Sequence, residues 1–384
     1  MRNPPRRMLT VIPLLLAISL SPLVTVSLIG EEKPQESPAQ TKQLKIKGVK
    51  TTSVQVSSEL LKQLTGKRQF DSEFLRKALT YRDEIPILEL PSGRKVALES
   101  IRAETKPTLE ERMKSLTIHP KVWKYLPYIR ADWIGRFHIS TGPPDNVDHS
   151  PCQSPVRDQG DRGTCTAFAS MAGYEGFASC SNQQTLDLSE QHTYHIFMQQ
   201  IGSYCRSDRG IYTWQGAGYL TSHHVCAESG MPYTSTLLSL PTNDNTHVPP
   251  ECSGNAPYGF VTTQTMFGTA FGGDATVNAN NTNYLESILS SGYDIVYGIY
   301  CAGSDWSDAT AEKGVIDVQL AGGKPAPAYA GHAMLLVGYD RPKQYFIFKN
   351  SWGTDQGHVG YLHISYNYLQ TYGKYGYYIT GITP

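Results

Sequence analysis

Residues 144–384 change from helix-type to strand-type patterning along their length, and this order restricts the folds that they can adopt. The earlier part predicts helices starting at Cys165, near Ser189 and over Tyr212 to Leu220. From Ile295 onward, short apolar segments predict strands, which cover Ile295 to Tyr300, Ala333 to Tyr339, Gln344 to Lys349 and Tyr361 to Tyr366. Helices followed by strands indicate an α+β domain with two lobes.

The chain before this domain divides into two further parts. The turn-forming sequence T-G-P-P at Thr141 to Pro144 marks a boundary at residue 143. At the start, three arginines precede an apolar run from Met8 to Gly30, so we expect residues 1–30 to be a cleaved signal peptide. The run is long enough to span a bilayer, which makes an uncleaved membrane anchor the alternative. Either outcome predicts a secreted or otherwise extracytoplasmic protein.

Residues 31–143 are interpreted as a folded pro-segment. Helices are expected over Ser57 to Leu64, Asp71 to Leu79 and Thr108 to Leu116. The last of these starts with a capping box, in which Thr108 is followed three residues later by Glu111. Two short strands are expected within Ile87 to Leu98, around a Pro-Ser-Gly turn. No catalytic constellation is recognisable in this part.

The net charge of zero conceals an asymmetry between the two ends of the chain. Residues 1–143 hold 24 Lys and Arg against 14 Asp and Glu, a net charge of +10, and residues 144–384 hold 10 against 20, a net charge of −10. Without the leader, residues 31–143 still carry +7. A basic segment joined to an acidic one suggests that the two dock on each other. The basic residues are spread out, so nucleic-acid binding is not expected.

A single cysteine lies where a helix is predicted to begin. Cys165 follows the sequence S-P-V-R-D-Q-G-D-R-G-T and precedes a run of small residues. The positive end of a helix dipole favours a thiolate, which is the nucleophilic form of cysteine. The later segments G-H-A-M-L-L-V-G-Y-D and K-N-S-W-G-T contribute His332 and Asn350, in the order that a Cys-His-Asn hydrolase requires.

Several of these blocks, taken in order, resemble the papain family of cysteine peptidases. The blocks are P-V-R-D-Q-G before Cys165, L-S-E-Q at Leu188 to Gln191, A-G-H-A-M-L-L-V-G-Y and K-N-S-W-G-T. The resemblance extends over Asn146 to Ile382. It implies a papain-like two-lobed fold, with a helical N-terminal lobe that carries the nucleophile. The C-terminal lobe would be an antiparallel β-barrel-like structure that carries the histidine and the asparagine.

The resemblance also assigns catalytic roles, and the general mechanism is carried over from the family. Cys165 takes the position of the nucleophile and His332 that of the general base and acid. Asn350 would bind the far ring nitrogen of His332 and hold the ring in place. Gln159 matches the glutamine whose amide stabilises the oxyanion, and Trp352 matches the indole that shields the His-Asn pair from water.

Substrate-binding positions follow from the same resemblance. Gly210 corresponds to a glycine that binds the substrate backbone. Tyr212 and Ala330 are expected to line the pocket for the substrate residue two positions before the scissile bond, which usually governs preference in this family. Trp352 is also counted among the expected substrate-binding residues.

Four positions depart from the family pattern. Arg162 stands where a disulfide cysteine is usual, and Thr166 replaces the tryptophan that follows the nucleophile. Gln356 replaces a second tryptophan, and the usual Gly-Gly pair is Gly210-Ile211. These departures leave the thiol–imidazole pair intact but change the edges of the cleft.

The chain has seven cysteines, all at or after Cys152. An exported chain can hold disulfides, and an odd count leaves at least one thiol unpaired. By position, Cys205 and Cys252 resemble one disulfide of the family.

The sequence therefore predicts a cysteine endopeptidase that is made as a secreted zymogen. Its expected partners are protein or peptide substrates and its own pro-segment, which would act as an intramolecular inhibitor and loosen as carboxylates become protonated. We expect a monomer without metal or other cofactor. Two alternatives remain open: a transpeptidase or ligase with the same site, and a non-catalytic binding module that kept the fold.

Overall fold

The computed structural model describes residues 49–101, 105–125, 142–201, 210–235, 252, 258–259, 261–274, 276–307 and 314–382. The expected signal peptide (residues 1–30), Thr141 of the boundary and Cys205 lie outside the described residues. The chain forms two units, residues 1–43 and residues 44–384, and the elements below all belong to the second. We call residues 49–125 the N-terminal segment and residues 142–382 the C-terminal region. None of the helices in the described ranges combines the length and the apolar character needed to cross a membrane.

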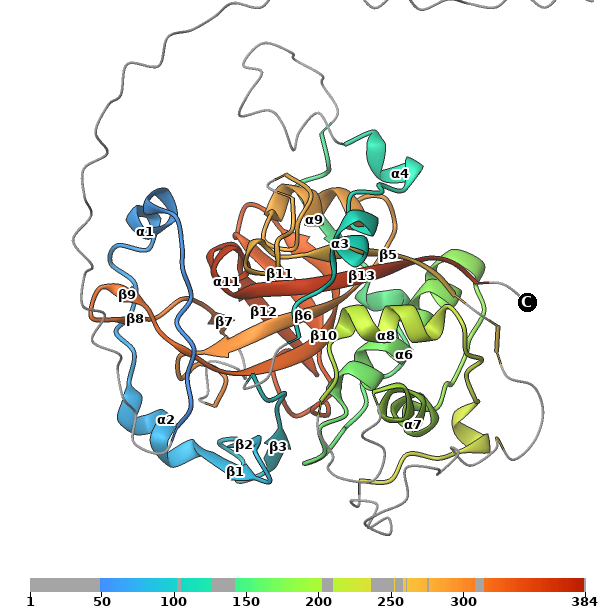
Figure 1. Cartoon of the computed structure of the whole chain (residues 1–384), viewed down its shortest axis with the longest axis horizontal. Coiled ribbons are helices and arrows are strands. Elements are labelled where there is room, and N and C mark those ends of the chain that lie inside the picture. Colours follow the sequence, from blue (N-terminus) through green and yellow to red (C-terminus); the bar gives the residue numbers. More distant parts are fainter. Residues whose placement is uncertain are drawn as a thin grey trace, which may run out of the picture. The chain divides into compact units, whose positions relative to one another are not determined.

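One eight-stranded sheet organises the C-terminal region (Figure 1). Its strands follow the order β5-β13-β6-β10-β11-β12-β7, and β4 pairs with β10. All neighbours are antiparallel except β12 and β7. The strands are β4 (Asn146–Asp148), β5 (Val261–Phe267), β6 (Ile295–Ala302), β7 (Val315–Ile316), β10 (Ala328–Asp340), β11 (Tyr345–Lys349), β12 (Tyr361–Ser365) and β13 (Gly373–Ile382).

The predicted strands are present as β6, β10, β11 and β12. Strands β5 and β13 were not predicted, because neither alternates between apolar and polar residues. In β13 the tyrosines Tyr375, Tyr377 and Tyr378 are all buried. This strand lies between β5 and β6 and is covered on both faces, which removes the polar alternation of a half-exposed strand.

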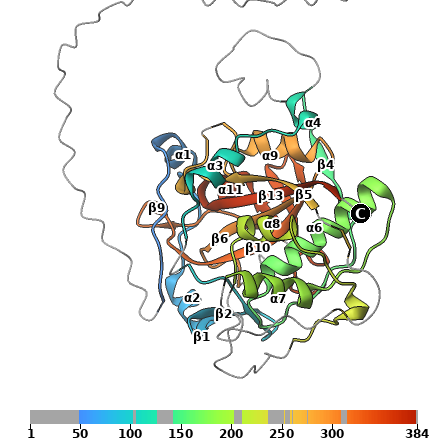
Figure 2. The same cartoon turned by 45° about the vertical axis from the view of Figure 1, so that its right-hand side comes forward.

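Helices α6 (Cys165–Asn182), α7 (Glu190–Gln200) and α8 (Thr213–Leu220) lie together beside the sheet, as Figures 1 and 2 show. These are the three helices predicted for this region. Two further helices, α9 (Thr282–Leu289) and α11 (Tyr366–Tyr372), were not predicted. Helix α9 begins where the Asn281 side chain accepts a hydrogen bond from the backbone of Tyr284.

Strand β10 separates two hydrophobic cores. Because successive side chains of a strand point to opposite faces, Ala333, Leu335 and Val337 pack into the core shared with α6 and α7. Met334 and Leu336 pack into the larger core on the other face. The strand is buried along nearly its whole length, so its register is strongly specified.

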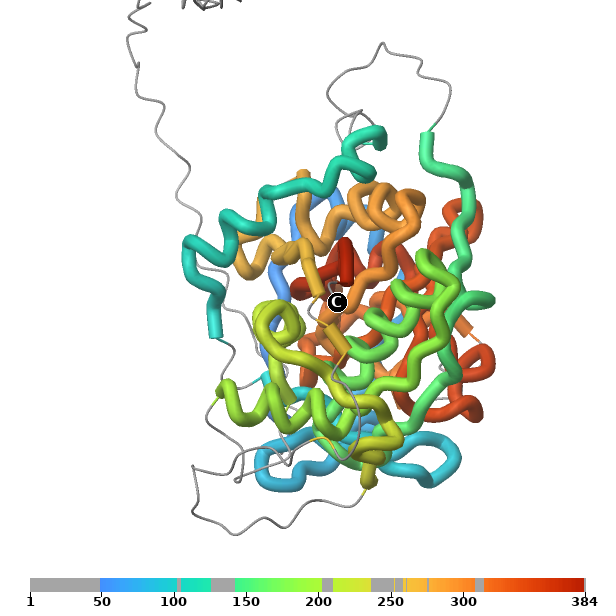
Figure 3. The backbone as a smooth tube through the Cα atoms, turned by 90° about the vertical axis from the view of Figure 1, so that its right-hand side faces the viewer, coloured from blue at the N-terminus to red at the C-terminus, as the bar shows by residue number. Residues whose placement is uncertain are grey.

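The N-terminal segment contains short elements that run around the C-terminal region (Figure 3). Its helices are α1 (Ser58–Gln63), α2 (Ser72–Ala78), α3 (Leu109–Lys114) and α4 (Pro120–Trp123), and its sheet consists of β1 (Leu79–Arg82), β2 (Ile85–Glu89) and β3 (Lys95–Ala97). The three predicted helices and the β2–β3 hairpin are present. The predicted capping box is also confirmed: Thr108 and Glu111 cap each other's backbone at the start of α3.

Apolar side chains of the N-terminal segment join the core of the sheet. Leu64, Leu75, Leu88 and Leu98 are fully buried in the larger core. Backbone contacts add to this packing, since Thr52 pairs with Ala328 and the Phe70 N–H donates to the Leu320 carbonyl at 2.8 Å. The N-terminal segment therefore packs as an extension of the C-terminal region.

Two disulfides are present among the described cysteines. Cys152 pairs with Cys180, with a Cα–Cα distance of 5.3 Å, and Cys226 pairs with Cys252, with a Cα–Cα distance of 5.8 Å. The predicted pairing of Cys205 with Cys252 is therefore wrong, because Cys226 lies within bonding distance of Cys252. Cys165 and Cys301 are free and buried.

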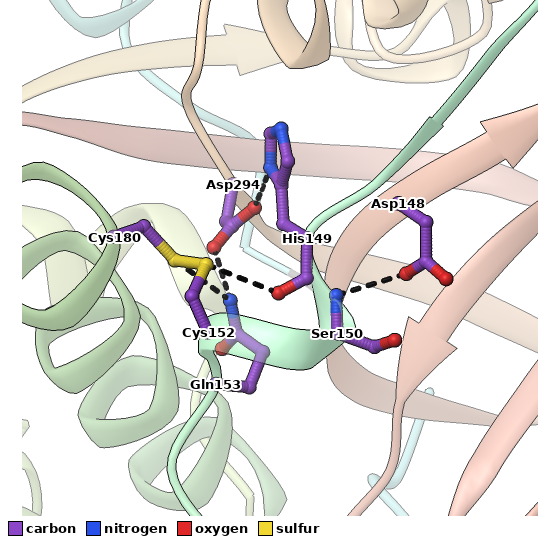
Figure 4. The surroundings of a disulfide bond; sticks show 7 residues. All are labelled: Asp148, His149, Ser150, Cys152, Gln153, Cys180 and Asp294. Carbon is purple, nitrogen blue, oxygen red and sulfur yellow. Dashed lines mark hydrogen bonds and ion pairs between the residues drawn. A yellow bond between two sulfur atoms is a disulfide. The ribbon is translucent and has the colours of Figure 1, made fainter.

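The Cys152–Cys180 disulfide attaches the start of the C-terminal region to the end of α6 (Figure 4). Beside it, Asp294 accepts hydrogen bonds from Gln153 at 2.6 Å and contacts His149 Nδ1 at 2.7 Å. Burial lowers the pKa of His149, but the hydrogen bond and charge of Asp294, together with Asp148, outweigh it and raise the pKa above its ordinary value.

Candidate active site

Cys165 is the first residue of α6 and is completely buried. The helix dipole favours its thiolate. Burial acts in the opposite direction and, with the negative charge of Glu99, raises the pKa of the Cys165 thiol to about 12. A hydrogen bond from the Ala333 backbone and two from Thr166 lower it by less. In this structure Cys165 is therefore an un-ionised thiol at neutral pH.

His332 lies on β10, immediately before Ala333, and is held from one side. Its Nε2–H donates to the Asn350 side-chain oxygen at 2.8 Å. Its Nδ1 is buried and has no hydrogen-bond partner among the described residues. Burial lowers the pKa of His332 to about 4, partly opposed by the hydrogen bond to Asn350. The free nitrogen is the one that can exchange a proton with a neighbouring group.

Two tryptophans shield the imidazole. Trp352 stacks on the ring of His332 with a centroid distance of 4.7 Å and an interplanar angle of 28°. Trp306 meets the same ring edge-on at 6.1 Å, and its own indole N–H donates to the Tyr368 hydroxyl at 2.7 Å. Trp306 was missed by the sequence analysis because it belongs to no recognised block.

Gln159 is oriented by three side-chain hydrogen bonds. Its Oε1 accepts from the Ser351 hydroxyl at 2.6 Å. Its Nε2 donates to the Arg162 carbonyl at 2.9 Å and to the Ala97 carbonyl at 3.1 Å. Because Ser351 follows Asn350 directly, one short segment after β11 positions both the His332 partner and the Gln159 amide.

The structure thus brings together the residues predicted to carry the chemistry. Helix α6 supplies the thiol, β10 the imidazole, and the segment from Asn350 to Trp352 the supports for both His332 and Gln159.

Residues 143–379 match the papain family cysteine protease domain. The chain belongs to this family. Cysteine proteinase B of Leishmania mexicana is 26% identical over 225 residues, which cover 58% of this chain and 44% of that protein. Chymopapain of Carica papaya is 23% identical over 275 residues, which cover 68% of each chain. The chain thus spans less than half the length of the Leishmania relative.

A solved structure shows the same fold. Xylellain, a cysteine protease from Xylella fastidiosa, superposes with a TM-score of 0.50 at 23% identity, covering 63% of this chain and 88% of that chain. Together with the family match, this confirms the predicted papain-like α+β fold. The prediction of a cysteine-type peptidase is confirmed at the level of the family.

Two of the four departures from the papain family pattern, Arg162 and Thr166, make contacts that connect parts of the site. The Arg162 guanidinium lies between the rings of Tyr194 and Tyr233, at 5.4 and 5.2 Å, and donates to the Gln191 amide oxygen at 2.7 Å. A buried cation held in this way crosslinks the loop before Cys165, where other members have a disulfide. The Thr166 hydroxyl donates to the Ile211 carbonyl at 2.6 Å and so ties α6 to the segment that contains Gly210. Gln356 is buried.

Of the predicted substrate-binding residues, Gly210 lies against the N-terminal segment, whereas Tyr212 and Ala330 contact residues of the C-terminal region. A Cβ atom on Gly210 would lie 3.0 Å from Cγ of Glu99. The ring of Tyr212 meets that of Tyr375 edge-on at 6.0 Å, and Ala330 is buried in β10 opposite Cys301 of β6. Glu99 also exchanges both backbone hydrogen bonds with Gly331, the residue before His332.

Two charged residues of this site were missed by the sequence analysis. Glu99 and Lys374 are both buried and lie 3.4 Å apart, although 275 positions separate them in the chain. No local pattern marks either residue, because their burial and their contact depend on parts of the chain that are distant in sequence. The clearest signal available beforehand was the opposite charge of the two regions.

Proposed function

We propose that this chain is a cysteine endopeptidase whose N-terminal segment holds it inactive as a zymogen. The observation that carries the proposal is that the Cys165 thiol at the start of α6 contacts the backbone of Ala333, the residue after His332 on β10. The Nδ1 atom of His332 has no hydrogen-bond partner among the described residues, and its Nε2–H donates to Asn350. Family membership supplies the class of reaction.

In the proposed mechanism, His332 takes the proton of Cys165 and the thiolate attacks the carbonyl carbon of the scissile bond. A C–S bond forms, and the negative charge on the carbonyl oxygen is stabilised by the Gln159 amide and the Cys165 backbone N–H. His332 then gives its proton to the leaving amine as the C–N bond breaks. A water molecule attacks the thioester, His332 accepts its proton, and the acid and the free thiol are released.

The N-terminal segment occupies the places that a substrate needs. The Ala97 carbonyl accepts a hydrogen bond from the Gln159 amide assigned to the oxyanion, and Glu99 pairs with Gly331 beside His332. The catalytic pair is uncharged in this buried state, and the Glu99 charge of the N-terminal segment adds to the shift of the thiol pKa. Burial raises the thiol pKa to about 12 and lowers the imidazole pKa to about 4, so each shift opposes a thiolate–imidazolium pair.

Ion pairs between basic residues of the N-terminal segment and acidic residues of the C-terminal region support an inhibitory segment. Arg82 pairs with Asp161 at 2.7 Å and Arg94 with Asp158 at 2.6 Å, and Arg94 also donates to the Trp352 carbonyl. Lys67 and Arg68 pair with Asp317 and Asp305. All these cations belong to the N-terminal segment and all the carboxylates to the C-terminal region. Each partly exposed pair contributes little alone, so the set acts together with the buried leucines.

Export is part of the same proposal. Disulfides persist in oxidising compartments, and Cys152–Cys180 and Cys226–Cys252 fit that setting. We therefore assign the protein to an extracytoplasmic location.

The test is covalent labelling with an epoxide thiol inhibitor, applied to the full-length precursor and to protein processed near Pro143. We expect label on Cys165 after processing and little before, with no label in a Cys165→Ala control. Equal labelling of both forms would remove the inhibitory role and leave the peptidase. Labelling of neither form, with no hydrolysis of any peptide, would favour a non-catalytic module.

A further inference from the structure

Lys374 is a fully buried lysine at the wall of the candidate active site. Its ammonium group lies 3.4 Å from Oε1 of Glu99, and the same oxygen accepts a hydrogen bond from the Tyr375 hydroxyl at 3.1 Å. The rings of Tyr300 and Tyr375 both lie 4.8 Å from Nζ, and that of Tyr212 lies at 5.7 Å. Aromatic faces and the Glu99 carboxylate thus lie close to the cation.

The space that holds the Glu99 carboxylate exists because two residues lack side chains. A Cβ on Gly331 would lie 2.8 Å from Oε2 of Glu99 and 3.0 Å from Nζ of Lys374. A Cβ on Gly210 would lie 3.0 Å from Cγ of Glu99. Neither glycine has a positive φ, so space rather than backbone conformation explains both. Any larger residue at Gly331 would push the carboxylate away from Lys374.

The backbone of the N-terminal segment places Glu99 close to the candidate catalytic residues. Ala97 places its carbonyl on the Gln159 amide, and two residues later Glu99 pairs with Gly331, next to His332. The Glu99 side chain therefore lies beside Gly210, the position assigned to the substrate backbone. Its partner Lys374 lies over the ring of Tyr212, a position assigned to the pocket for the substrate residue two positions before the scissile bond.

The two members of the ion pair have different fates on activation. Glu99 leaves with the N-terminal segment, whereas Lys374 belongs to β13 and stays. Removing a carboxylate from a buried cation raises the free energy of the cation, because its lost hydration is no longer offset. A new anion in the same place lowers that free energy again. The Tyr375 hydroxyl and the aromatic rings remain to orient such an anion.

We infer that Lys374 makes the processed enzyme prefer an acidic side chain, glutamate or aspartate, two residues before the scissile bond. The inference rests on the proposed peptidase function and specifies its substrate class. In the precursor, the Glu99 side chain occupies the position beside Lys374 that the acidic side chain of the substrate takes in the processed enzyme.

The experiment compares fluorogenic dipeptide amides with arginine next to the scissile bond and Glu, Gln, Leu or Lys before it, using enzyme processed from the full-length precursor. A buried charge-assisted contact should favour Glu over Gln by about 10- to 100-fold in kcat/KM. Lys374→Met should bring this ratio to about one, and Lys374→Glu should favour Lys over Glu. The matched control is Lys343→Met, an exposed lysine 68% accessible, which should leave the ratio unchanged.

Each outcome separates the inference from the function on which it rests. An enzyme that takes epoxide label on Cys165 but cleaves Gln or Leu substrates as fast as Glu substrates would overturn the role of Lys374 and leave the peptidase. An enzyme with neither label nor hydrolysis would overturn the peptidase itself. If both Lys374 variants fail to fold, the Glu-to-Gln ratio of the unmodified enzyme still decides, because the inference requires it to exceed one clearly.

Discussion

The N-terminal segment and the C-terminal region differ in how each is held together. The C-terminal region has a sheet of eight strands with core on both faces. The N-terminal segment has one small cluster of its own, made of Ile85, Ile87 and Ala97, and its other buried apolar residues join the core of the sheet. Among the described residues, seven large hydrophobic side chains are exposed, and five of them belong to the N-terminal segment, namely Phe74, Leu109, Met113, Leu116 and Trp123.

For the zymogen proposed above, this difference explains how the N-terminal segment could be released while the C-terminal region stays folded. A segment whose own core is only one small cluster folds on its partner, so releasing it means unfolding it. The contacts that hold it are ion pairs, leucines buried in the larger core and two isolated backbone bridges to β10, Thr52–Ala328 and Glu99–Gly331. If the N-terminal segment inhibits the enzyme and the C-terminal region folds without it, four experimental results are expected, of which the change in Cys165 reactivity is the largest.

The first prediction concerns the reactivity of Cys165 as a function of pH. In the precursor the thiol pKa is about 12, so alkylation by iodoacetamide should keep rising up to pH 10 and above. After processing, water reaches both groups and the thiolate–imidazolium pair can form, so the rate should be level between about pH 5 and pH 8. At pH 7 we expect a difference of about 1000-fold or more, because reactivity follows the thiolate fraction.

Mass spectrometry of the alkylated Cys165 peptide measures these rates, with Cys165→Ala as the control. Identical pH profiles in both forms would show that the N-terminal segment does not control the ionisation of Cys165. That result would contradict this part of its proposed inhibitory role.

The second prediction separates a catalytic from a structural role for Gln159. Removing one oxyanion donor typically costs about 100- to 1000-fold in kcat, so Gln159→Ala should lower turnover by that amount in the processed enzyme. In the precursor it removes three side-chain hydrogen bonds, to Ala97, Arg162 and Ser351, and should also lower the melting temperature, so kcat is measured below the unfolding transition. Gln184→Ala, at an exposed position after α6, is the matched control. A Gln159 variant with normal kcat would remove this residue from the site.

The third prediction concerns the ion pairs that hold the N-terminal segment on the C-terminal region. Arg94 contacts Asp158, Asp355 and the Trp352 carbonyl, so Arg94→Gln should speed conversion of the precursor about 10-fold, as expected for losing charge-assisted hydrogen bonds. Arg76→Gln is the control, since Arg76 pairs with Glu73 inside the N-terminal segment. Gel densitometry over time measures the conversion. Equal rates in both variants would mean that the ion pairs do not hold the segment.

The fourth prediction concerns the stability of the C-terminal region. The pKa of His149 is raised in the folded state by Asp294, so this pair stabilises the protein below the unfolded histidine pKa of about 6.5, and the effect disappears as pH rises through the folded pKa. Asp294→Asn should therefore lower the free energy of unfolding by about 1 kcal/mol more at pH 5 than at pH 8.

Urea unfolding of the processed protein at both pH values measures this difference. Asp145→Asn, which alters an exposed pair with Arg341, serves as the control. A loss of the same size at both pH values would mean that His149 is not charged in the folded protein.

Local features of the chain could be predicted because they depend on near neighbours. The Thr108–Glu111 capping box, the helix that begins at Cys165 and the β10 strand around Ala333 all follow from spacing within a few residues. The order of the Cys165, His332 and Asn350 blocks was also readable, and the structure places Asn350 against the ring of His332. The strand β13 was not readable, because burial on both faces removes the alternation that marks a strand.

The sequence by itself determined the family, the order of helices and strands, the candidate catalytic residues and the opposite charges of the two regions. Only the tertiary structure decided which cysteine meets Cys252, which aspartates meet the basic residues, and that Glu99 reaches Lys374. The physical reason is the distance along the chain between the interacting residues. Helix caps and strand alternation are set by neighbours along the chain, whereas the partner of a distant charge or thiol is chosen by the packing of the whole fold.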